Sequence, residues 1–156
     1  MHLLRVVGVR VELPANQPVV LLREADGPRY LPIWIGAPEA SAIAFHQQGI
    51  QAARPLTHDL LRDVVEALGA KLESVHITEL RDDVFYAELR FAGGVSVSAR
   101  PSDAVALALR CEVAIYGRNE VLDAAGIEIP DEQEDEVERF REFLDNVTPE
   151  DFATDG

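Results

Sequence analysis

Two parts of the chain that lie 64 residues apart repeat one order of patterns, and this repeat restricts the fold more than any other feature. Each part has three short runs of alternating apolar residues, followed by an alanine-rich segment that opens with proline and a carboxylate. Alternation with period two predicts strands, and the proline-led segments predict helices. Leu31 matches Val95 in the third runs, and Glu39 matches Asp103 at the helix starts. We therefore expect an α+β domain with a pseudo-twofold relation between its halves.

The expected elements come from the apolar periodicity and from the Gly, Pro, Asn and Asp residues between the runs. The two strand-strand-strand-helix halves should form one mixed or antiparallel sheet with the helices packed on it. Strands are expected at 6–13, 19–22, 31–35, 70–80, 84–91, 95–99 and 113–116, and helices at about 38–48, 57–68, 102–110 and 118–125.

Charge and length divide the chain into a body and a tail. The 156 residues fit one domain, which we expect to span residues 1–127. Residues 128–156 hold 12 acidic and 2 basic residues, which accounts for −10 of the net charge of −14. Apolar residues at helical spacing within this tail, from Val137 to Leu144, predict an amphipathic helical appendage. Its charge favours a basic protein partner.

Several classes of protein are disfavoured by composition and motifs. No apolar run reaches the ~18–20 residues of a membrane-spanning helix, so we expect a cytoplasmic protein without a membrane partner. The single cysteine, Cys111, disfavours disulfide and zinc chemistry. Phosphate-binding loops, nucleophile elbows and zincin motifs are absent from the sequence. The net charge of −14 argues against a generic nucleic-acid binder, because such proteins normally present a basic surface.

Three stretches resemble the bifunctional nuclease domain family. They are RPSDAVALAL at 100–109, YLPIWIG at 30–36 and RPLTHDL at 54–60, and the resemblance covers roughly residues 3–125. It implies a compact α+β domain, oligomeric in many members, that cleaves DNA and RNA. It supplies no agreed catalytic residues, and the acidic tail differs from the nuclease-partner motif found in some members.

Phosphodiester hydrolysis requires an activated water and neutralisation of charge on the phosphoryl oxygens, and carboxylate-held metals commonly supply both. Glu39, Asp59 and Asp103 are candidates because each stands in the first turn of an expected helix, where an anionic ligand is favoured. We assign Glu39 and Asp103 to a divalent metal, Mg²⁺ or Mn²⁺, and Asp59 and Asp103 to catalysis. Alternatively, these carboxylates only offset the helix dipoles.

His58 is a candidate general base or acid, since its ordinary pKa lies near neutrality; alternatively it is a capping or exposed histidine. Arg54, Arg100 and Ser102 are candidates for phosphate binding at the two helix starts. Thr57 and Ser102 have an alternative role as helix caps.

Other conspicuous residues have structural interpretations. Trp34 is expected in the core or at a subunit interface rather than as a base-stacking platform. His46 and His76 are expected to be structural, and His2 to lie in a frayed terminus.

Two functions remain open. The first is a metal-assisted nuclease of low activity that acts on DNA and RNA. The second is a non-catalytic interaction or regulatory module that forms a homo-oligomer, a dimer by first choice, and binds a partner through its acidic tail.

Overall fold

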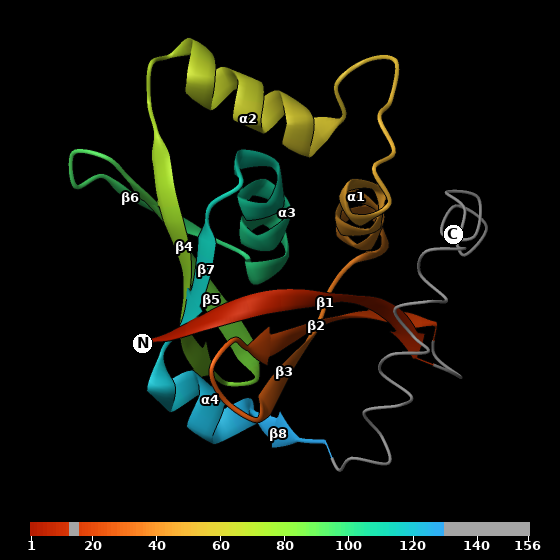
Figure 1. The fold of residues 1–156 in the computed structure, drawn as a ribbon, viewed down its shortest axis with the longest axis vertical. Helices are drawn as coiled ribbons and strands as arrows, with labels where there is room; N and C mark the ends of the chain where they lie inside the picture. The colour runs from red at the N-terminus through yellow and green to blue at the C-terminus, as the bar shows by residue number, and fades with distance from the viewer. Residues whose placement is uncertain (13–15, 130–156) are drawn as a thin grey trace.

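The computed structural model describes residues 1–12 and 16–129 as one eight-stranded mixed sheet with four helices packed on it. The expected α+β class is confirmed (Figure 1). The strands are β1 (His2–Glu12), β2 (Gln17–Glu24), β3 (Arg29–Trp34), β4 (Leu72–Arg81), β5 (Val84–Phe91), β6 (Ser96–Ala99), β7 (Ala114–Gly117) and β8 (Ile127–Glu128). The helices are α1 (Ala37–Gln47), α2 (Thr57–Ala67), α3 (Pro101–Cys111) and α4 (Asn119–Ala125).

The sheet consists of two antiparallel meanders on either side of one short strand. Its order is β6-β5-β4-β7-β1-β2-β3-β8, so β7 separates the second meander from the first. β7 runs parallel to β4 and antiparallel to β1. The repeat also appears in the helices, because α1 and α3 each contain 11 residues and begin 64 positions apart. These two helices pack against each other.

The core lies between the sheet and the pair α1 and α3. Small residues on both helices, such as Ala40 and Ala104, are fully buried and allow the helices to approach closely. Gly49 and Gly69 adopt positive φ values of 70° and 76°, as expected for glycines that end a helix. Larger side chains fill the space between the layers, among them Val20, Leu22, Leu31, Ile43, Val75, Ile77, Val105 and Leu107.

Four observations differ from the sequence expectations. β1 contains a bulge between Val6 and Gly8, which changes the alternation of the first strand. His2 is not frayed, because it begins β1 and its ring contacts Glu24 and Asn119. Trp34 is 59% exposed rather than buried in the core.

The fourth difference concerns α2, which lies over α3 at one end of the molecule, opposite to α4 (Figure 1). Its only buried residue is His58, and its apolar stripe is exposed along its length. The sequence pattern therefore located the helix correctly but not its environment. The helix expected in the tail lies outside the described residues, and the domain boundary at residue 127 stays a prediction.

Candidate functional site

Four of the predicted site residues form one hydrogen-bonded network where three helices begin. Arg100 donates from Nε to Oδ2 of Asp103, at 2.9 Å, and from Nη2 to Oε1 of Glu39, at 2.6 Å. Asp103 Oδ1 in turn lies 2.9 Å from Nε2 of His58. Glu39, His58 and Asp103 stand within the first three residues of α1, α2 and α3, respectively. The fold thus assembles residues that are up to 64 positions apart in the chain.

The helix starts explain why the network forms at this place. Pro38 and Pro101 fix the first turns of α1 and α3, and the residues that precede the helices, Gly36 and Arg100, make no side-chain cap. The carboxylates of Glu39 and Asp103 therefore remain free for contacts between helices. Gly36 leaves room for Glu39 as it lies here, because a Cβ at this position would be 2.5 Å from Oε2 of Glu39 and would displace the carboxylate.

The electrostatics of the network keep Asp103 ionised. Burial alone would raise its pKa, but the hydrogen bonds and charges of Arg100 and His58 outweigh burial and hold the pKa below its ordinary value. A carboxylate only accepts hydrogen bonds, so the Nε2 of His58 must carry the proton. In neutral His58 the lone pair therefore resides on Nδ1. This arrangement orients the imidazole as an acid or base.

The exposed fractions show from which side the network can be reached. The side chain of His58 is 10% exposed, that of Asp103 is 31% exposed and that of Arg100 is 66% exposed. A cavity of about 370 Å³ adjoins Arg100 and Ser102. A ligand in that cavity would meet the guanidinium first and the histidine last.

Asp59 lines a second cavity, away from the network of its neighbour His58. Its Oδ1 accepts a 2.6 Å hydrogen bond from Nε of Arg110, and its Oδ2 accepts one from the backbone N–H of Leu56. Burial would raise the pKa of Asp59, but Arg110 outweighs this effect and lowers the pKa. One oxygen of Asp59 thus fixes the start of α2, and the other joins α2 to α3 through Arg110. These contacts favour a structural role for Asp59 over a catalytic one.

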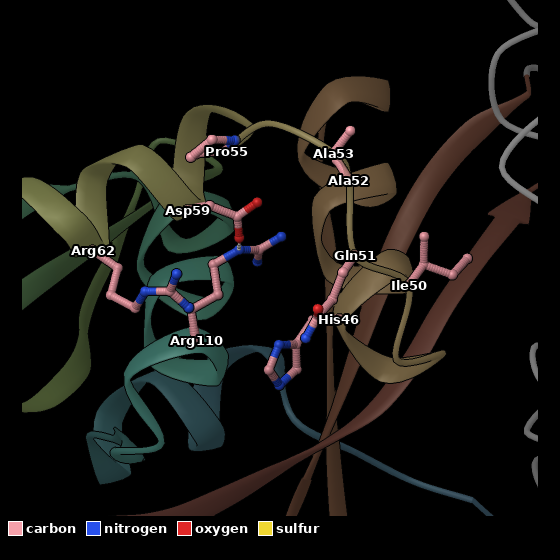
Figure 2. A pocket seen from close by; sticks show the side chains of 9 residues that line it. All are labelled: His46, Ile50, Gln51, Ala52, Ala53, Pro55, Asp59, Arg62 and Arg110. Atoms are coloured by element: carbon pink, nitrogen blue, oxygen red, sulfur yellow. Dashed lines mark hydrogen bonds and ion pairs between the residues drawn. The ribbon is translucent and has the colours of Figure 1, made fainter.

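This second cavity has a volume of about 400 Å³ and lies between α1, α2, α3 and the loop before α2. Figure 2 shows Arg62 and Arg110 on one side and His46 on the other, with Asp59 above Arg110. Arg110 also donates to the carbonyl oxygens of Ala42 and Ala106, so its side chain, only 4% exposed, ties three helices together. Sequence reasoning missed Arg110; its signal was one cation among the apolar residues of a helix.

The structure also shows where the other predicted phosphate-binding and helix-capping residues lie. Arg54 is exposed in the loop before α2 and takes no part in the network. Ser102 is buried and lines the smaller cavity beside Arg100. Neither Thr57 nor Ser102 caps its helix, because Leu56 and Arg100 hold the N-cap positions and no side-chain cap is formed.

The network, as its side chains lie, does not fit a divalent metal between Glu39 and Asp103. The guanidinium of Arg100 already lies between the two carboxylates and neutralises one of their two charges. Among residues 1–12 and 16–129, no group of three or more His, Cys, Asp or Glu side chains is placed to hold a metal ion. The predicted Mg²⁺ or Mn²⁺ stays a prediction.

His76, which is buried, and His46, which is exposed beside the larger cavity, predict a loss of stability in mild acid. Partial loss of hydration lowers the pKa of both histidines below 6.5, with Arg110 and Arg90 adding to the effect. The unfolded chain therefore binds more protons than the folded chain as the pH falls below 6.5, and the free energy of unfolding should decrease. Urea denaturation at pH 7.5, 6.5 and 5.5 measures this. Replacing both residues, as His46→Asn and His76→Asn, should flatten the slope, and a flat wild-type curve would contradict the prediction.

The fold and the site define an α+β domain in which a His-Asp pair and an exposed arginine meet at three helix starts. Comparison with known proteins agrees with this class. The sequence model of the bifunctional nuclease domain matches residues 20–130, and the chain belongs to that family. No helix within the described residues is long and apolar enough to cross a membrane.

Individual relatives fall into two groups. An uncharacterized protein of Mycobacterium tuberculosis H37Rv is 59% identical over 95% of this chain and 96% of its own length. Bifunctional nuclease 1 of Oryza sativa is 26% identical over 80% of this chain, and bifunctional nuclease 1 of Arabidopsis thaliana is 27% identical over 65%. The matched regions cover 39% and 33% of these two plant proteins.

Proposed function

We propose that this chain hydrolyses phosphodiester bonds in DNA and RNA with low activity, and that the network of Glu39, His58, Arg100 and Asp103 is its reaction centre. The observation that carries the proposal is the hydrogen-bonded order His58–Asp103–Arg100–Glu39 in a member of the bifunctional nuclease family. The exposed guanidinium of Arg100 would contact the phosphate, and the His58–Asp103 pair would move the proton.

In this reaction a water attacks phosphorus, its proton passes to a base, and the bond from phosphorus to the leaving oxygen breaks. His58 accepts the proton on Nδ1 when neutral, while Asp103 stabilises the imidazolium that results. The imidazolium of His58 then gives this proton to the leaving oxygen, which departs as the alcohol and leaves His58 neutral again. The start of helix α3 places the positive end of its helix dipole beside Arg100.

Charge balance explains why the activity should be low. With His58 neutral, the two carboxylates and one guanidinium of the network sum to one negative charge, which repels a phosphate. Phosphate binding should weaken as the salt concentration rises, because the attraction comes from the exposed guanidinium of Arg100, which salt screens.

Cleavage of labelled DNA and RNA oligonucleotides by highly purified protein tests the proposal. The expected result is slow cleavage by the wild type and loss of cleavage in His58→Ala, with and without Mg²⁺, Mn²⁺ or EDTA. Activity that disappears only in EDTA would instead support the predicted divalent metal. Equal cleavage by the wild type and His58→Ala would contradict the proposed centre and identify a contaminating nuclease.

A second proposal, self-association, has its own observation. Seven of the eleven large apolar side chains exposed in the described residues lie on α2 or β6 or next to an end of them: Leu56, Leu60, Leu61, Val64, Leu68, Val95 and Val97. The segment that leaves α2 lies beside the segment that leads into β6, since Ala92 donates a backbone hydrogen bond to Lys71. Monomeric proteins rarely expose large apolar surfaces. We name these seven residues the α2–β6 surface.

The position of β6 favours a second copy of the chain as the occupant of this surface. β6 is an edge of the sheet, and residues 91–99 contain no charge, although edge strands of monomers are normally protected by charged residues. Antiparallel pairing of two such edges is symmetric, as in most dimers. This supports the predicted homodimer. The partner of the acidic tail stays a prediction, since residues 130–156 lie outside the description.

We therefore expect light scattering at micromolar concentration to give about twice the chain mass of 17.2 kDa. Leu68→Lys and Val97→Lys should each convert the protein to the monomer, because an unpaired charge would be buried in the dimer. Ile127→Lys, at an exposed apolar position on β8, is the matched control and should leave the dimer intact. A monomeric wild type would contradict the prediction.

A further inference from the structure

Trp34 is the only tryptophan of the chain, and 59% of it is exposed. It follows Ile33, which is buried, so alternation along β3 turns the indole to the opposite face of the sheet. Trp34 also lines the cavity of about 370 Å³ that contains Arg100, with Phe85 and Val84 on the other side. An exposed aromatic ring and an exposed guanidinium thus border one hollow of the size of a ligand site.

Exposed arginines lie on the same face of the sheet as Trp34. The register places Arg10, Val19 and Trp34 in one row across β1, β2 and β3. A second row, four residues along β2, consists of Arg5, Arg23 and Tyr30, with the Arg23 guanidinium 5.3 Å from the centre of the Tyr30 ring. At about 3.3 Å per residue the rows are roughly 13 Å apart.

On this face β2 presents Gln17, Val19, Leu21 and Arg23, and β3 presents Tyr30, Pro32 and Trp34, so neither strand contributes a carboxylate. In a chain of net charge −14, this face combines cations with the exposed ring of Trp34, while Tyr30 is buried and Asp83 is the one carboxylate that lines the cavity. Such a combination suits an anion that also has flat apolar parts.

We propose that this face and the cavity beside it bind single-stranded nucleic acid, with one base stacked on Trp34, the adjacent phosphate on Arg100 and a further phosphate on Arg5. The inference deepens the proposed function by naming the substrate form. Single strands are favoured because a base in a duplex is already stacked and cannot offer its face to a side chain, whereas splayed bases stack on aromatic residues. The network beside Arg100 would then act on the bond that follows the stacked base.

Because Trp34 is the only tryptophan, its fluorescence reports this site alone. The full chain carrying His58→Ala, which prevents cleavage, is titrated with a single-stranded oligothymidylate and with a duplex of the same length. We expect quenching by the single strand and much less by the duplex. Affinity, measured by anisotropy of a labelled oligonucleotide, should fall at least about 5-fold in Trp34→Leu and less in Trp34→Phe. Circular dichroism verifies that each variant folds.

Arg5→Ala should also weaken binding and reduce its salt dependence. Arg62→Ala, which removes an arginine of α2 outside this face and this cavity, is the matched control and should bind like the parent. An oligonucleotide that leaves Trp34 fluorescence unchanged, or that binds Trp34→Leu as tightly as the parent, would overturn the inference. Quenching without cleavage by the wild type would remove the proposed nuclease activity but keep this site, and cleavage without quenching would do the reverse.

Discussion

Replacement of Arg110 by alanine is expected to lower the free energy of unfolding by about 3 kcal/mol. The guanidinium is almost fully buried and serves three partners: the carboxylate of Asp59 and the carbonyl oxygens of Ala42 and Ala106. Its removal leaves these acceptors without their donor and opens a cavity between three helices. The value lies near the lower end for a broken buried pair, because the side chain of Asp59 is 25% exposed and can be hydrated.

Urea denaturation at neutral pH measures this loss in the free energy of unfolding. Two further variants give values for comparison. Arg110→Lys keeps a positive charge near Asp59 but cannot reach all three partners, so its loss should be intermediate. Arg81→Ala breaks an ion pair whose partners are 59% and 49% exposed, and it should cost less than about 1 kcal/mol. A cost for Arg110→Ala as small as that for Arg81→Ala would show that the buried contacts contribute little.

Local patterns were sufficient to locate most of the fold. The expected strand at 84–91 coincides with β5, and the 64-residue repeat located α1 and α3, which begin at Ala37 and Pro101. These elements depend on turn residues and on periodicity within a few neighbours, and both are visible in the sequence. The bulge in β1 was not predicted, because it is a property of the pairing between two strands.

Burial was harder to predict than position. The apolar stripes of α2 and α3 look equally suited to a core, yet Leu68 is 80% exposed and Leu107 is fully buried. Which stripe is covered depends on how the whole sheet places its helices, and on partners outside one chain. The same reason explains Trp34, whose apolar neighbours on β3 face the other side of the sheet.

The candidate site was also predicted only in part: its residues were identified from the sequence, but their contacts were not. The sequence singled out Glu39, His58, Arg100 and Asp103 as first-turn residues or their neighbours, and the fold brings all four together. The choice of partners could not be predicted, because adjacent residues on a helix point about 100° apart. His58 and Asp59 therefore serve two separate clusters. Arg110 occupies the repeat position of His46, and both line the larger cavity.

Loss of either member of the His58–Asp103 pair is expected to reduce cleavage about 100-fold, the lower range for a general acid or base. Asp103→Asn keeps the size of the side chain but removes the charge that orients and stabilises the imidazole. Asp103 is ionised at neutral pH because its pKa lies below 3.8, so the substitution removes a full negative charge throughout the neutral range.

The decisive measurement is the double variant. If His58 and Asp103 act as one unit, the two substitutions together should cost about the same 100-fold as either alone, since the second removes a function already lost. Independent roles would multiply to about 10⁴-fold. Asp63→Asn, at an exposed carboxylate of α2 paired with Arg62, is the control and should keep the wild-type rate. Multiplicative losses in folded variants would show that Asp103 acts without His58 and that the 2.9 Å contact between them is structural.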